Sequence, residues 1–207
     1  MTTARIAVAA VAAAVLTACS GSPAPTTAPA SSPASSPASG GEPSGGTTAT
    51  EVNPAGDIPD NQAYVPFTPP GGGFTVKIPE GWASSTAGDT TTFTDKLNQV
   101  QVTSSRSAAA PTTTSVTATD VPALKAKTPN FAMGQVSTVS RAAGQATLLT
   151  YQGDSAPNPV TGKVVRDAFE RYSFFRAGTR VDLTLSGPTN ADNVDPWRTV
   201  TDSLSWS

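Results

Sequence analysis

The chain of 207 residues contains no histidine and a single cysteine, Cys19. Without histidine, neither Ser-His-Asp nor Cys-His nucleophilic catalysis can be assembled, and most zinc and copper sites are excluded. The Gly-x-Ser-x-Gly, Ser-x-x-Lys, Walker A and Gly-x-Gly-x-x-Gly motifs are also missing. The sequence therefore favours a protein with no catalytic residues, no metal site and no cofactor.

Charged residues are scarce as well. They make up 14% of the chain, and 13 Lys+Arg against 15 Asp+Glu leave a formal net charge of -2. A nucleic-acid-binding protein would need a clustered excess of basic residues. Nucleic acid is therefore not expected as a partner.

The N-terminus has the pattern of an export signal. Arg5 precedes an apolar run, Ile6–Leu16, which is too short to span a bilayer. The tetrad LTAC that ends at Cys19 resembles a bacterial lipobox. The resemblance implies that residues 1–18 are a lipoprotein signal peptide and that acylated Cys19 holds the protein on the extracytoplasmic face of the cell membrane. An ordinary signal peptide with an incidental cysteine is the alternative.

A change in composition divides the chain after Cys19 into two parts. Residues 20–61 are rich in Ser, Pro, Ala, Thr and Gly and contain no aromatic residue. Such a segment cannot bury enough apolar area to offset its conformational entropy. We therefore predict a lipidated, disordered tether over 19–61 and one folded domain over 62–207, which holds every aromatic residue.

Within this domain the hydrophobic pattern has mostly period two, which is typical of strands. Short turns such as Ala177-Gly178 make neighbouring strands antiparallel. Two helices are expected to cover the apolar face of the sheet, which makes an α+β domain. The predicted strands are 74–78, 90–95, 99–105, 135–142, 146–153, 164–175 and 180–186.

The two helices have recognisable start signals. The first should lie within 119–129, with Thr119 or Asp120 as its cap, and should end before Pro129. The second closes the chain, with Asp192 or Asn193 as its cap. Helical spacing places Val194, Trp197, Val200 or Thr201, and Leu204 on its buried face.

The segment GGGFTVKIPEGW at 71–82 resembles the opening strand and turn of PsbP-like domains, and the later order of elements also matches. The chain is similar to actinobacterial lipoproteins of the LpqN/LpqT type, which join a lipobox and a Thr/Pro/Ser-rich tether to one such domain. The resemblance covers roughly residues 64–206. It implies an α/β/α sandwich on a mostly antiparallel twisted sheet, no common catalytic set, and a non-enzymatic binding or assembly role at the cell envelope.

The best candidate for a ligand site is an arginine-rich hairpin. Arg166 and Arg176 share one face of their strand with Tyr172 and Phe174, which suits a partly apolar anionic partner. That partner could be a lipid headgroup, an anionic envelope polymer or an envelope protein. The alternative is a solvated face on which four arginines pair with carboxylates. These arginines are Arg166, Arg171, Arg176 and Arg180, and the carboxylates are Asp167, Glu170 and Asp182.

Two groups of acidic or amide residues are further candidates, one for acid–base catalysis and one for metal binding. Asp167 and Glu170 are three residues apart on a strand and point to opposite faces, so they cannot act as a local acid–base pair. The cluster Asn190, Asp192, Asn193 and Asp195 offers oxygen ligands for calcium, but a helix N-terminus favours the same residues as caps. The leading hypothesis is therefore a binding module, and the alternative is a carrier that holds a lipid or other hydrophobic ligand between sheet and helices.

Overall fold

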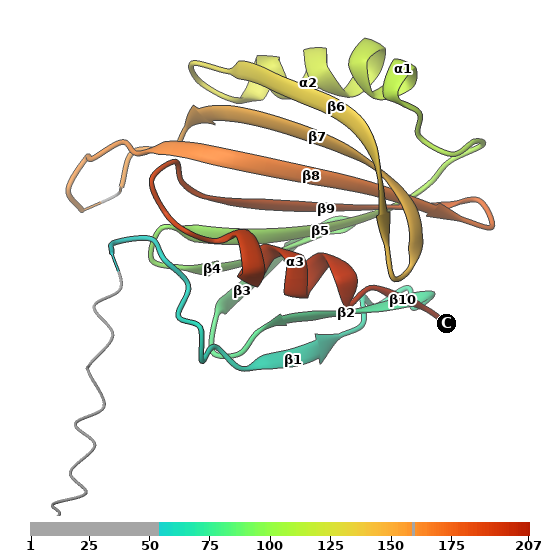
Figure 1. Ribbon diagram of the computed structural model, residues 1–207, viewed down its shortest axis with the longest axis horizontal. Coiled ribbons are helices and arrows are strands. Elements are labelled where there is room, and N and C mark those ends of the chain that lie inside the picture. The colour runs from blue at the N-terminus through green and yellow to red at the C-terminus, as the bar shows by residue number, and fades with distance from the viewer. Residues whose placement is uncertain (1–53, 159) are drawn as a thin grey trace, which may run out of the picture. The chain divides into compact units, whose positions relative to one another are not determined.

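The computed structural model describes residues 54–158 and 160–207 (Figure 1). The predicted signal peptide, Cys19 and residues 20–53 of the predicted tether lie outside the described residues. A seven-stranded antiparallel sheet dominates the described part, and each neighbouring pair of strands is antiparallel, as the short turns predicted. In spatial order its strands are β3 (Ala83–Ala87), β4 (Thr90–Asp95), β5 (Asn98–Arg106), β9 (Thr179–Pro188), β8 (Arg166–Arg176), β7 (Gly144–Asp154) and β6 (Ala132–Arg141).

One face of this sheet carries the main hydrophobic core. A small sheet of β1 (Tyr64–Phe67), β2 (Phe74–Pro79) and β10 (Ser205–Trp206) packs there together with helix α3 (Val194–Asp202). The period-two pattern of β9 places Val181, Leu183 and Leu185 in this core. Their neighbours Asp182 and Thr184 point to the other face, because successive side chains of a strand alternate.

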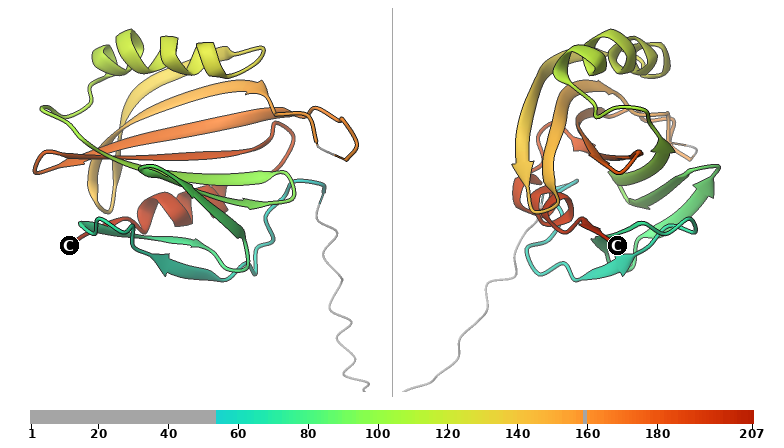
Figure 2. Two further views of the ribbon diagram at one scale, coloured as in Figure 1. Left: turned by 180° about the vertical axis from the view of Figure 1, so that it is seen from behind. Right: turned by 90° about the vertical axis from the view of Figure 1, so that its right-hand side faces the viewer.

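A helical segment packs on the opposite face. It consists of α1 (Thr113–Ser115), the π-helical turns η1 (Val116–Asp120) and α2 (Val121–Lys127). Val116 packs there against Leu149 and Tyr151 in a second, smaller core. Figure 2 shows this segment and α3 on either side of the curved sheet. The predicted α+β class and α/β/α sandwich are therefore confirmed.

The first helix begins earlier than predicted. Thr112, not Thr119 or Asp120, forms the cap: its hydroxyl accepts from the Ser115 N–H at 3.1 Å, and its own N–H donates to the Ser115 hydroxyl at 2.9 Å. This reciprocal pair is a capping box. Asp120 lies inside the helical segment, which ends before Pro129 as predicted.

The structure also differs in detail from the prediction for the closing helix. Val194 is 71% exposed, so it does not belong to the buried face that Trp197 and Val200 form. Asn193 occupies the cap position, but its side chain makes no capping hydrogen bond. It accepts from the Ile58 N–H at 2.8 Å and donates to the Gly56 carbonyl at 3.0 Å instead.

These contacts show that residues before position 62 belong to the folded domain. Ile58 is buried in the main core, and the Gly56 carbonyl also accepts a hydrogen bond from the Asn98 amide. Residues 54–61 therefore pack on the folded domain, and the boundary predicted between 61 and 62 is too late. No helix in the part of the chain that the structure describes is long and apolar enough to cross a membrane.

Candidate functional site

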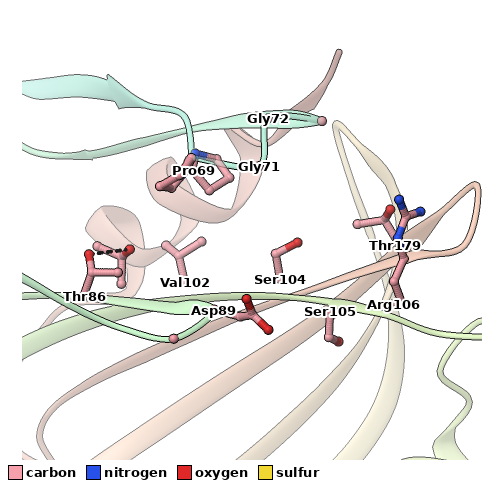
Figure 3. A pocket seen from close by; sticks show the side chains of 14 residues that line it. Pro69, Gly71, Gly72, Thr86, Asp89, Val102, Ser104, Ser105, Arg106 and Thr179 are labelled. Atoms are coloured by element: carbon pink, nitrogen blue, oxygen red, sulfur yellow. Dashed lines mark hydrogen bonds between the residues drawn. The ribbon is translucent and has the colours of Figure 1, made fainter.

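A cleft opens between the β1–β2 turn and the seven-stranded sheet. We call it the interlayer cleft, and it has a volume of about 420 Å³. Figure 3 shows the turn on one side and the residues of β3 to β5 on the other. The cleft is lined by Pro69, Pro70, Gly71, Gly72, Gly73, Thr86, Gly88, Asp89, Thr91, Val102, Ser104, Ser105, Arg106 and Thr179.

The sequence of the turn keeps the cleft open. Gly72 and Gly73 have φ angles of 65° and 87°, in the left-handed region that favours glycine, and the Gly72 N–H donates to the Pro69 carbonyl at 2.8 Å. The three glycines carry no side chains, and the space that a Cβ would occupy at each of them is open. Pro69 and Pro70 limit the conformations available to the other half of the turn.

Two charged side chains are available in the cleft. Asp89 lies in the turn between β3 and β4, and Arg106 ends β5. Both are exposed, and neither forms an ion pair with a residue that the structure describes. In Figure 3 Ser104 lies between these two residues, and Thr179 lies beside Arg106. This arrangement can bind a small ligand that carries polar or charged groups, but it offers no nucleophile paired with a base.

The four residues predicted as a ligand site do not form one exposed patch. Tyr172 and Phe174 are only 3% and 1% exposed, because their face of β8 packs into the main core. Arg166 pairs with Asp154 at 3.2 Å and donates to the Asn130 carbonyl at 2.7 Å, whereas Arg176 is exposed at the far end of the strand. Their ligand-binding role stays a prediction.

The other two arginines of the hairpin are engaged in ion pairs under the helical segment. Arg171 and Arg180 both bind Asp182, at 2.8 Å and 3.0 Å, and Arg180 also pairs with Asp120 of η1. The pairing with Asp182 that the alternative predicted is found for these two arginines, but Asp182 is buried and does not lie on a solvated face. Neither Asp167 nor Glu170 forms an ion pair with a described residue, and Glu170 accepts a hydrogen bond from the Tyr172 hydroxyl instead.

Asp167 and Glu170 point to opposite faces of β8, as the spacing predicted, so they form no acid–base pair. In the acidic segment before α3, Asn193 is tied to Gly56 and Asn98. Among residues 54–158 and 160–207, no three acidic, histidine or cysteine side chains come together as a possible metal site. The cleft itself was missed by sequence reasoning, and its one signal is the Pro-Pro-Gly-Gly-Gly turn at 69–73.

Asp167 makes stability depend on pH. It is 7% exposed, and burial, with a smaller contribution from the Asp154 carboxylate, raises its pKa to about 6. The folded state therefore binds more protons than the unfolded state, in which the pKa is about 3.9. The free energy of unfolding should fall as pH rises from about 4 to above 6.

We expect Asp167→Asn to raise the free energy of unfolding at pH 7.5 by about 1 to 3 kcal/mol and to flatten this pH dependence. Urea denaturation at several pH values measures both effects. Asp192→Asn, at an exposed position, is the matched control. A variant with the wild-type slope between pH 4 and 7 would show that another group titrates.

No protein-family model matches the sequence, and no curated protein sequence matches it. Solved structures do match. The cyanobacterial PsbP from Synechocystis is 14% identical with a TM-score of 0.50, and the match covers 70% of this chain and 94% of that one. The described domain therefore has a PsbP-like fold.

Two further structures are similar at lower TM-scores. A protein from Bacteroides thetaiotaomicron is 10% identical over 69% of this chain, with a TM-score of 0.48, and the match spans about half (48%) of that protein. LpqN of Mycobacterium tuberculosis, described as involved in cell envelope biogenesis, is 12% identical over 72% of this chain and 92% of its own, with a TM-score of 0.43. These similarities concern the fold, and membership of the LpqN/LpqT type stays a prediction.

Proposed function

We propose that this protein is a lipoprotein that acts as a non-enzymatic binding module on the extracytoplasmic face of the cell membrane. The lipobox-like tetrad ending at Cys19 supports the anchor. The lack of histidine supports a role without nucleophilic or zinc chemistry. Residues 20–53 would hold the PsbP-like domain away from the membrane surface.

The interlayer cleft is the proposed binding site. The observation that carries the proposal is the pair Asp89 and Arg106, which are exposed and unpaired within the described residues around an opening of about 420 Å³. This volume falls in the range of small-molecule sites, which is about 300 to 1,000 Å³. A ligand with both an anionic and a cationic group, or a charged segment of an envelope partner, would match this pair.

The carrier alternative has weaker support. A site for a lipid chain should be lined mainly by apolar side chains. The cleft contains one large aliphatic side chain, Val102, and two prolines, and its other lining residues are glycine, hydroxyl-bearing or charged. The cleft therefore suits a polar ligand better than a hydrocarbon chain.

Charge reversal at Arg106 tests the proposal. The wild-type protein, used as bait on a detergent-solubilised envelope extract of its own host, should retain a defined set of partners or ligands. Arg106→Glu should lose most of them at low salt, and the difference should shrink as salt rises, because ions screen exposed charges beyond about 10 Å at 0.1 M. Native circular dichroism would establish that the variant is folded.

Two matched variants interpret the result. Lys125→Glu reverses an exposed charge on α2, outside the cleft, and should bind as the wild type does. Arg176→Glu reverses the exposed end of the hairpin that the sequence favoured. Full retention by Arg106→Glu would reject the cleft, and a loss confined to Arg176→Glu would favour the hairpin instead.

A further inference from the structure

A second concave site lies on the other side of the main core. It is a groove of about 400 Å³ that is lined by residues of α3, β6, β7 and β8. We call it the α3 groove. The side chains that the argument uses are Met133, Thr150, Gln152, Glu170 and Trp197. Glu170 is the single lining residue that is charged at neutral pH.

The Glu170 carboxylate is held in place by a chain of hydrogen bonds. The Tyr172 hydroxyl donates to Glu170 Oε2 at 2.7 Å, and Arg141 Nη2 donates to the same hydroxyl at 2.8 Å. Burial and, to a smaller extent, the hydrogen bond to Glu170 raise the pKa of Tyr172 to about 12, so the phenol remains a donor at neutral pH. The carboxylate is therefore oriented by a group that stays neutral.

Arg141 forms no direct ion pair with this carboxylate. Its guanidinium lies over the Tyr172 ring, 4.8 Å from the centroid, and its Nε donates to the Thr201 hydroxyl at 3.1 Å. Its salt bridge is with Asp202, at 3.7 Å. Glu170 Oε1 takes no hydrogen bond from any side chain that the structure describes. The Glu170 carboxylate thus lines the groove without a direct ion pair to a described residue, and the Arg141 guanidinium reaches it only through the Tyr172 hydroxyl.

The remaining lining residues suit a cation with a short alkyl stem. Trp197 lines the groove and is 8% exposed. An indole attracts cations, and the thioether of Met133, which is nearly half exposed, is a soft apolar contact. Thr150 and Gln152 add polar atoms along β7.

We infer that the α3 groove binds a primary ammonium or guanidinium group, with Glu170 as its counter-ion. Such a group is carried either by a free amine or by a lysine or arginine side chain of a peptide. This inference does not depend on the interlayer cleft, which lies at a different place and binds through Asp89 and Arg106. The two sites can therefore be tested separately.

The test uses the whole chain carrying Cys19→Ala, with the indole N–H resonance of Trp197 as the reporter. The chain has three tryptophans, so Trp197→Phe identifies this resonance by its loss. The probes are N-acetyl-lysine amide, N-acetyl-arginine amide and n-butylamine, and N-acetyl-norleucine amide is the uncharged control. The three cationic probes should shift the resonance in a saturable way, and the norleucine probe should not.

Glu170→Gln is the decisive variant, because glutamine keeps an acceptor for the Tyr172 hydroxyl and removes the charge. It should weaken binding of the cationic probes by about tenfold to a hundredfold, the range expected for one lost charge-assisted contact. Glu80→Gln, at an exposed position outside the groove, should bind as the wild type does, and so should Arg106→Glu.

The probes also distinguish the source of the cation. Equal affinity for n-butylamine and N-acetyl-lysine amide would assign the groove to the ammonium group of a free amine. Tighter binding of the two amides would assign it to a peptide side chain. Unchanged affinity in Glu170→Gln, or an equal shift with the norleucine probe, would overturn the inference.

Discussion

Replacing Asp182 with asparagine should destabilise the domain by about 3 to 5 kcal/mol, the cost of breaking a buried charge pair. The Asp182 side chain is 5% exposed and accepts hydrogen bonds from Arg171, Arg180 and Ser173. Asparagine would leave the two guanidinium groups, which are 16% and 18% exposed, with too little negative charge between sheet and helical segment.

Urea denaturation of the variant and the wild type measures this loss. Asp95→Asn is the matched control, because its pair with Lys96 is solvent-exposed and should contribute less than about 1 kcal/mol. If Asp182→Asn cost no more than this control, Asp120 alone would be sufficient to hold Arg180, and the cluster would have little importance for stability.

Replacing Cys19 with alanine should remove the protein from the membrane or leave its signal peptide uncleaved. Each buried methylene of an acyl chain contributes about 0.8 kcal/mol, so two chains bind almost permanently. Alanine has no thiol to acylate. Membrane fractionation, with mass spectrometry of the N-terminal peptide, measures both the location and the lipid.

Ser20→Ala is the control for this experiment, because it changes the next residue and keeps the thiol. It should be acylated and fractionate with the membrane. If the Cys19→Ala protein were processed at the same bond and stayed in the membrane fraction, the similarity to a lipobox would be incidental.

The strands of the large sheet could be predicted wherever one face is buried. β2, β4 and β5 were located because apolar side chains such as Val76 and Val100 alternate with polar ones. β3 was missed, since all five of its residues, Ala83–Ala87, are exposed and none is strongly apolar. Its pairing with β4 comes from backbone hydrogen bonds, which leave no pattern in the sequence.

The start of the domain was missed for a different reason. Residues 54–61 contain two prolines, a glycine and no aromatic residue, and Ile58 is their single large aliphatic residue, so they resemble the segment before them in having little apolar surface. Ile58 is held by Asn193, which is 135 positions away in the sequence. A contact of this length depends on the completed fold, so composition could not locate the boundary.

The candidate site shows the same limit. Strand periodicity correctly placed Tyr172 and Phe174 on one face, but it could not tell that β2 and α3 would cover that face. The interlayer cleft depends on how the turn at 69–73 approaches β5, and the α3 groove depends on how far α3 extends over the sheet. Both are long-range distances that local sequence does not encode.

The contacts of Asn193 have a mechanical consequence. If the chain is held on the N-terminal side of the described domain, tension reaches Gly56, Asp57 and Ile58 before any strand. Side-chain hydrogen bonds join these residues to Asn98, Asp192 and Asn193. A pull from that side would therefore load the hydrogen bonds of Asn98 and Asn193 before it reached a strand of either sheet.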